Sequence, residues 1–463
     1  MKKRILAICM ALCLTLSAVP VAFAAEGEDA PFTPNTSWYD ANKSEFTISS
    51  AEELAGLAQL VNDGNDFARK TITLDENINL ENREWTPIGY GGKTFKGTFD
   101  GRGHTISNLV IDQPRRSNVG LFGYTENGEV KNFTLNNAKV TGYLEVGAVA
   151  GTPYTSKYTD IAVTGLIEVN GFAYVGGALG KNAYADVTNV DITGDTGSYV
   201  NAESGIYRTY VGGLIGFMGE GSHTVSKCDV KIDVMGSTCD VGGILGILHY
   251  GNTLVNCTYE GSLTLTDPDA DGGDEFGALV GTVHNGGRGP TKIKSCEATV
   301  HKATSGASDV TETITPHGDF YSDLTGTDEK GDPLNTGAVT IEATVNNVPV
   351  TVDNNVASVG TKAYKTLPEA IEAANGAAGE DLVTVTINRS GEYAPFTISR
   401  DDVTVEAAEG VQVSIPVSKN SKFAVTADGV TLRDLSFTTD DAATIISSGD
   451  CNALTLDLSL IHI

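Results

Sequence analysis

A short glycine-rich segment recurs six times between residues 119 and 281, and this repeat constrains the fold more than any other feature. The six copies start 27, 29, 36, 30 and 35 residues apart. They are Val119–Gly123, Val146–Gly151, Val175–Gly180, Val211–Gly216, Val241–Gly246 and Phe276–Gly281. A period of this size is typical of solenoid or array proteins, in which each repeat is one structural unit.

Each copy is followed by a second pattern, in which a polar residue precedes an apolar one. The apolar positions are Leu109, Phe133, Ile161, Val190, Cys228, Cys257 and Cys296. The polar positions are Asn108, Asn132, Asp160, Asn189, Lys227, Asn256 and Ser295. We expect the apolar series to form an inward ladder, with Leu109 as its first rung. The polar series, mostly Asn, suits a tight bend.

The repeats are rich in Gly and β-branched residues, and segments such as Cys228–Val234 alternate with a period of two. Such alternation is typical of half-buried strands, and no helical periodicity separates the copies. These patterns predict an all-β fold, a right-handed parallel β-helix with one coil per repeat. Coils of this kind stack at about 4.8 Å, the interstrand spacing. A β-propeller is the alternative, although its blades usually need about 40 residues or more.

The first 24 residues predict an export signal. Lys2, Lys3 and Arg4 precede an apolar stretch over 5–19, and Ala22–Ala24 supplies a small-x-small cleavage site. The apolar stretch is too short to span a membrane comfortably. We therefore expect a secreted or cell-surface protein without a membrane span after cleavage. Residues 25–44 are expected to be flexible.

A capping helix is expected before the first coil, because open sheet ends of a solenoid need covering. Apolar residues recur at helical spacing in Ser49–Leu60, and Ser49 with Glu52 fits a capping box. Strands are predicted to follow at 71–74 and 78–80.

The repeat region resembles bacterial surface proteins that carry GLUG motifs. The resemblance rests on Phe46–Leu60, Trp85–Gly89 and Phe95–Leu109 together with the glycine-rich repeats, over residues 45–300. It implies an exported β-helical surface region without a defined catalytic activity. The motif also occurs in non-catalytic parts of immunoglobulin A protease-like proteins. The zinc-protease pattern His-Glu-x-x-His is absent from this sequence, so no protease function is carried over.

A second, partial β-helix is predicted at 339–457, after a linker rich in Thr, Ser, Asp and Gly at 301–338. A short helix is expected at Tyr364–Ala374, with Thr366 as its N-cap. With the Gly391–Tyr393 turn and the short strands that follow, this part resembles the opening of pectin-lyase-like β-helices. The catalytic carboxylates and arginine of such enzymes cannot be mapped onto this chain.

The last six residues, 458–463, are mostly apolar, unlike the acidic and polar segment before them. One back-translation of Leu-Ser-Leu-Ile-His-Ile matches the end of a sequencing-library adapter. We expect this ending to be an artefact of a reading frame cut at a contig edge; a genuine apolar strand is the alternative.

Composition excludes some function classes. The net charge of −28 argues against nucleic-acid binding and against electrostatic docking on an anionic membrane. Five cysteines remain outside the leader, too few and too dispersed for a disulfide framework. They are Cys228, Cys239, Cys257, Cys296 and Cys451. Cys228 and Cys257, on adjacent coils, fit either packed thiols or a disulfide.

One segment is a candidate calcium site. Asp267, Asp269 and Asp271 occupy positions one, three and five of an EF-hand-like loop, with a glycine at position six and Glu275 at position nine. Position twelve is Ala278 and no flanking helices are evident. The alternative is a solvated acidic insertion between coils. No other cofactor is expected.

The remaining charged and histidine residues that could suggest a catalytic site are expected to have structural roles. Asp100, Arg102 and His104 lie in a Gly-spaced segment that predicts a corner. Arg102 also forms the only basic cluster, with Arg115 and Arg116. Five histidines are expected in loops: His223, His249, His284, His301 and His317.

Tyrosines gather in the repeat region and could pack between coils or stack on sugar rings. They are Tyr143, Tyr154, Tyr158, Tyr174, Tyr184, Tyr207, Tyr210 and Tyr250. The sequence therefore predicts a non-catalytic, adhesin-like surface protein that binds host or microbial glycans or proteins, or acts as a spacer. A polysaccharide lyase or esterase whose catalytic coils lie outside this sequence is the alternative. The ligand, the cell anchor and the oligomeric state stay open.

Overall fold

The computed structural model describes most of the chain beyond residue 30. The described residues are 31–203, 209–268, 276–284, 290–321, 339–353, 356–360, 362–364, 366–379, 381–388, 391–408, 411–418, 422–438, 446–448, 454–457 and 460–462. The predicted export signal at 1–24 lies outside them. Neither of the two helices found among these residues is long and apolar enough to cross a membrane.

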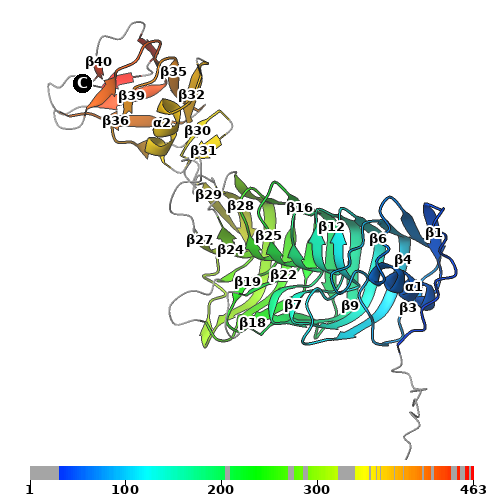
Figure 1. Ribbon diagram of the computed structural model, residues 1–463. Helices are drawn as coiled ribbons and strands as arrows, with labels where there is room; N and C mark the ends of the chain where they lie inside the picture. The colour runs from blue at the N-terminus through cyan, green and yellow to red at the C-terminus, as the bar shows by residue number, and fades with distance from the viewer. Residues whose placement is uncertain are drawn as a thin grey trace, which may run out of the picture.

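The first structural unit consists of three sheets whose strands run mostly parallel and lie side by side from blue to green in Figure 1. A 17-stranded sheet comprises β1 (Glu45–Ile48), β2 (Thr71–Leu74), β3 (Ile78–Asn79), β4 (Thr98–Asp112), β6 (Glu129–Thr141), β9 (Lys157–Gly171), β12 (Asp186–Gly194), β13 (Tyr199–Ala202), β16 (Thr224–Ser226), β17 (Asp229–Lys231), β18 (Asp233–Gly236), β21 (Thr253–Val255), β22 (Thr258–Leu265), β25 (Thr291–Ser305), β26 (Ser308–Asp309), β28 (Val339–Val345) and β29 (Val348–Asp353).

Two narrower sheets are built from the glycine-rich repeats. The seven-stranded sheet comprises β5 (Phe122–Glu126), β8 (Ala150–Tyr154), β11 (Leu179–Asn182), β15 (Ile215–Met218), β20 (Leu245–Leu248), β24 (Val280–His284) and β27 (His317–Tyr321). The five-stranded sheet comprises β7 (Leu144–Gly147), β10 (Ala173–Gly176), β14 (Tyr210–Gly212), β19 (Asp240–Gly242) and β23 (Phe276–Gly277). The all-β prediction is confirmed.

The register of these sheets follows the sequence repeat. Val146 pairs with Val175, Val175 with Val211, and Val211 with Val241, so equivalent residues of successive copies are direct neighbours. Each copy from Val146 onward supplies one strand to the five-stranded sheet and then, after a tight turn, one to the seven-stranded sheet. The first copy supplies β5 to the seven-stranded sheet, and its Val119 forms only an isolated bridge with Val146. We call one such repeat, with its strand in the 17-stranded sheet, a coil.

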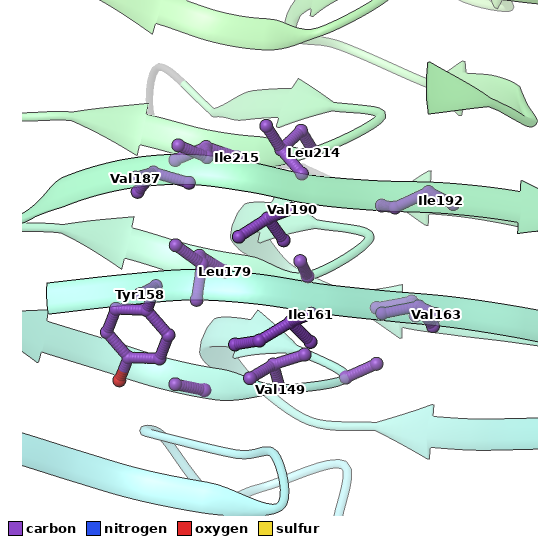
Figure 2. Close-up of a cluster of buried hydrophobic side chains, with 14 of the residues drawn as sticks. Val149, Tyr158, Ile161, Val163, Leu179, Val187, Val190, Ile192, Leu214 and Ile215 are labelled. Carbon is purple, nitrogen blue, oxygen red and sulfur yellow. The ribbon is translucent and has the colours of Figure 1, made fainter. Parts of the chain in front are cut away.

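The apolar ladder is buried as predicted, from Phe133, 3% exposed, to Cys296, 1% exposed. Phe133 pairs with Ile161, and Ile161 with Val190. From Asn132 to Ser295, the polar residue before each rung has a positive φ, between 51° and 57°, which bends the strand. Figure 2 shows the inward side chains of β9 and β12 packed against those of the repeat strands.

Leu109 is not the first rung of this ladder, contrary to the expectation. It pairs with Ala138, because β4 and β6 bend twice and Asn108 belongs to the second bend. There the Asn137 side-chain amide donates to Asn108 Oδ1 at 3.0 Å. The motif Asn-apolar occurs at both bends, so spacing alone could not separate them.

Helix α1 (Ala51–Asn62) covers the N-terminal end of the first unit. Its N-cap is Ser50, whose hydroxyl accepts from the Glu53 backbone N–H, so the predicted Ser49–Glu52 pair is off by one residue. The segment expected to be flexible also differs: Phe32 is buried, and Trp38 and Tyr39 pack against the core. These rings cover the apolar surface that the first coil would otherwise expose.

The first core extends further than the sequence suggested. Strand β27, within the expected linker, pairs with β24, and β28 pairs with β25. Strand β29 then folds back antiparallel on β28. The first core therefore includes Val339–Val345, and the next buried cluster begins at Ala357.

The second unit has its own buried core and three smaller sheets. Helix α2 (Leu367–Asn375) has the predicted N-cap, Thr366, in a capping box with Glu369. The strands are β30 (Ala357–Val359), β31 (Lys362–Tyr364), β32 (Val383–Ile387), β33 (Gly391–Glu392), β34 (Thr397–Ile398), β35 (Val403–Ala407), β36 (Val413–Pro416), β37 (Phe423–Val425), β38 (Thr431–Arg433), β39 (Leu435–Thr438), β40 (Ile446–Ser448), β41 (Thr455–Asp457) and β42 (Leu460–His462). From β32 onward they pair in parallel.

Candidate functional site

A groove lies on the outer face of the two repeat sheets. It has a volume of about 430 Å³. Its lining residues come from five successive segments of the repeat: Asn118, Tyr124, Glu145, Thr152, Tyr154, Lys181, Ala183, Tyr184, Phe217, Gly219, Glu220 and His249. Because alternate strand residues point outward, stacking the coils brings these distant positions onto one surface.

One row of rings crosses the seven-stranded sheet from coil to coil: Tyr124 lies within β5, Tyr154 ends β8 and Tyr184 follows β11. The ring centroids of Tyr124 and Tyr154 are 6.4 Å apart, and those of Tyr154 and Tyr184 are 5.5 Å apart. The row continues to His223, 5.9 Å from Tyr184. Tyr154 and Tyr184 are each 36% exposed, so their rings can contact a ligand.

A second row crosses from the five-stranded to the seven-stranded sheet. Tyr174 and Tyr210 stack at 5.9 Å with an angle of 12° between their planes. Phe217 meets both rings edge-on, and the His249 ring follows 4.9 Å from Phe217. The His284 ring lies 4.6 Å beyond His249. The groove therefore has aromatic surfaces over several coils.

Charged side chains lie among the rings. Lys181 Nζ is 5.3 Å from the Tyr174 ring centroid and 5.4 Å from that of Phe217, within cation–π range. Glu145, half-buried with φ of 53°, interacts electrostatically with Lys181. Burial raises the pKa of Glu145, while Lys181 and a hydrogen bond with Ser117 oppose that rise. Glu220 is exposed and hydrogen-bonds the Tyr250 hydroxyl.

Two of the five histidines, His223 and His249, lie outside the strands as predicted, and the other three do not. His284, His301 and His317 lie in strands β24, β25 and β27. His249 and His284 are neighbours in the second row, and burial lowers the pKa of His249 to about 3. The two positions are 35 residues apart in the sequence, so only the coil register places them together.

The structure divides the eight predicted tyrosines. Tyr158 is buried, with its hydroxyl 2.8 Å from that of Thr125, and Tyr143 stacks on Phe172 outside the groove lining. Tyr207 lies outside the described residues. The others line or flank the groove: Tyr154, Tyr174, Tyr184, Tyr210 and Tyr250.

Sequence reasoning missed the remaining groove residues, above all Glu145, Lys181 and Phe217. Each lies at an outward position next to a glycine-rich segment. This placement is the signal that could have revealed them, had the outward positions been aligned between copies.

The other sequence candidates have different outcomes. Of the calcium site, Asp267 is described, while Asp269, Asp271 and Glu275 lie outside the described residues. No group of three or more His, Cys, Asp or Glu side chains able to hold a metal occurs among the residues that the structure describes. Asp100–His104 forms the predicted corner: the Arg102 backbone N–H donates to Asp100 Oδ1 at 2.9 Å.

Four cysteines fall within the described residues; all four are buried, and none of them forms a disulfide there. The packed-thiol interpretation of Cys228 and Cys257 is confirmed: the Cys228 backbone N–H lies 3.4 Å from Cys257 Sγ. Cys451 lies outside the described residues.

A second hollow, of about 390 Å³, lies over the bend of the 17-stranded sheet. Arg102, Asn132, Asp160, Asn189 and Asp191 contribute its polar lining. Burial raises the pKa of Asp191. The aromatic part of its lining is Phe133, which is buried, so this hollow offers no exposed ring.

These features define an all-β repeat protein with an aromatic groove on one face. No protein-family model matches the chain. Over 148 residues it is 35% identical to Halomucin of Haloquadratum walsbyi, a match covering 30% of this chain and 2% of Halomucin. Over 114 residues it is 29% identical to a protein of Evansella cellulosilytica, provisionally described as a Gly-rich membrane protein, covering 24% and 13% of the two chains. The chain thus spans only a small part of these relatives.

Among solved structures, the chain is similar to a protein from Bacteroides ovatus that is provisionally named an immunoglobulin A1 protease. The TM-score is 0.45 and the sequence identity is 18%. The similarity covers 64% of this chain and 86% of that one.

Proposed function

We propose that this protein is a non-catalytic, exported surface protein that binds glycans through the aromatic groove. The observation that best supports the proposal is that two exposed tyrosines, Tyr154 and Tyr184, lie among polar side chains in the groove lining. Tyrosine rings offer flat apolar faces for sugar rings and lose little conformational entropy on binding. Asn118 and Glu145, which line the groove, supply a donor and acceptors for hydroxyl groups.

The fold and the expected cellular location support the same proposal. Parallel pairing of equivalent residues in successive coils supports the parallel β-helix that the GLUG resemblance implies. We propose the right hand for it, as is usual for parallel crossovers. The predicted leader at 1–24 and a relative described as a membrane protein favour the cell surface. A stacked repeat presents a long surface for repeated weak contacts.

A glycan-array screen of the full chain, followed by titration of the best glycan, tests this function. We expect Tyr154→Ala and Tyr184→Ala each to weaken binding about tenfold, since a lost ring contact is worth about 1 kcal/mol or more. Tyr143→Ala is the matched control, because this exposed tyrosine lies outside the groove lining. Equal affinity of all three variants and the parent chain, or turnover of the glycan, would contradict the proposal.

A further inference from the structure

We infer that the groove selects an uncharged, linear glycan that runs across the coils, and this inference rests on the proposed glycan-binding function. Three observations carry it: the balance of charge in the lining, the direction of the ring rows, and the number of coils that they cross.

The charge of the lining disfavours acidic sugars. Two carboxylates, Glu145 and Glu220, line the groove against one cation, Lys181. That cation is already engaged, since its ammonium lies near the Tyr174 and Phe217 rings and interacts with Glu145. A sugar carboxylate entering the groove would meet an excess of like charge on a chain of net charge −28.

The polar groups suit neutral hydroxyl groups instead. Half-buried Glu145 presents carboxylate oxygens, and carboxylates form strong hydrogen bonds with neutral donors. The buried Thr152 hydroxyl donates to Asn118 Oδ1 at 2.6 Å, which orients the Asn118 side chain and leaves its amide N–H groups for a ligand. Such a mixture of donors and acceptors matches the hydroxyl groups of a hexose.

The ring rows fix the direction of the ligand. Tyr124, Tyr154 and Tyr184 come from three successive coils, and His223 extends the row to a fourth. Tyr124 pairs with Thr152 and Tyr154 with Ala183, so the row shifts along the strand direction from one coil to the next. A ligand contacting the rings therefore crosses the strands obliquely, from coil to coil. Each coil advances the surface by about 4.8 Å, comparable with the length of one sugar unit in an extended chain. Four coils therefore accommodate about four sugar units.

A matched pair of oligosaccharides tests the charge selection. Titration of the full chain with β-1,4-linked mannotetraose and with its tetramannuronate counterpart compares sugars that differ only in the carboxylates. At low salt we expect the neutral tetramer to bind at least tenfold more tightly, and added salt to narrow the difference by screening the repulsion. The double variant Glu145→Gln, Glu220→Gln should also reduce the difference in affinity between the two tetramers.

A neutral β-1,4-mannan length series from two to six units tests the orientation. Affinity should rise up to about four units and then level off, since four coils carry the ring row. Affinity that is equal for the disaccharide and the hexasaccharide would overturn the inferred orientation.

Two further outcomes separate this inference from the proposed function. If tetramannuronate binds as tightly as mannotetraose or more tightly, and Tyr154→Ala weakens it, the groove binds glycans but the inferred selection is wrong. If neither tetramer nor any array glycan responds to Tyr154→Ala, the proposed function itself fails.

Discussion

At the residue scale, His249 shows how the coil stack changes the chemistry of a single side chain. It lies between Phe217 and His284, and burial, together with the nearby His284 and Lys181, lowers its pKa to about 3. An unfolded chain leaves this histidine with its ordinary pKa near 6.5. The native state therefore holds His249 neutral at pH values where the unfolded chain binds a proton.

This difference predicts a pH-dependent stability. The contribution of His249 is fully present above pH 6.5 and is lost as the pH falls toward 3. Between pH 6.5 and 5 its loss approaches about 1.4 kcal/mol per pH unit. Denaturant unfolding of the full chain at several pH values should show a shallower decline for His249→Phe, which keeps a ring beside Phe217. His301→Gln, at an exposed position, is the control; equal slopes for parent and His249→Phe would contradict the account.

The bend residues give a second prediction at this scale. Asn189 has φ of 55°, and its side-chain amide donates to Asp160 Oδ1 at 2.7 Å. Asn189→Gly should lose about 1 kcal/mol with that hydrogen bond, because glycine tolerates the positive φ. Asn189→Val should lose a further ~1–2 kcal/mol from backbone strain. Equal free energies of unfolding for the two variants would show that the bend does not constrain the residue.

At the element scale, the turn between the two repeat sheets explains why glycine recurs there. A Cβ atom on Gly176 would lie 2.1 Å from the Leu179 carbonyl oxygen and 2.7 Å from the Gly216 nitrogen of the next coil. Both obstacles are backbone atoms, which cannot rotate away. Close backbone packing within the turn and against the next coil, rather than a special φ, fixes glycine at this position.

Gly176→Ala should therefore destabilise the first unit by about 2 to 3 kcal/mol, a typical cost of overpacking. Gly391→Ala is the matched control, since the nearest atoms to its Cβ lie 3.8 Å away on the Tyr393 ring. Thermal unfolding followed by circular dichroism measures both. A Gly176→Ala variant that is as stable as the control variant would contradict the close-approach explanation.

The sequence predicted the elements better than it predicted the site. Equivalent positions such as Val146 and Val175 were paired correctly, because aligning the copies of the repeat also aligns the strands that pair in the sheet. Outward residues such as Lys181 and Phe217 differ in type between copies, so only an alignment of the outward positions could have marked them, and their proximity depends on how the coils stack. Local signals also allowed small errors, as at Ser49, where either of two adjacent serines could cap the helix.

At the scale of the whole molecule, the described residues form two separate buried clusters. The first includes residues from Phe32 to Val345, and the second those from Ala357 to Phe437. Each is capped by its own helix, α1 or α2. No buried residue is shared between the two clusters, so each unit has its own source of hydrophobic stability.

Two cores predict two unfolding transitions in calorimetry of the full chain. Leu245→Ala, in the first core, should lower one transition, and Phe423→Ala, in the second, should lower the other. Each deletion of a buried side chain should cost about 2 to 5 kcal/mol. A single transition that both variants shift together would contradict two independently stable units.

The most direct test of the central claim is a crystal structure of the full chain with its best-binding neutral oligosaccharide. We predict sugar rings against Tyr154 and Tyr184, with the chain of sugars crossing β8 and β11 from coil to coil and reaching Glu145 and Lys181. Sugar bound instead in the hollow beside Asn132 and Asp160, with the aromatic groove empty, would contradict the claim that the groove is the binding site.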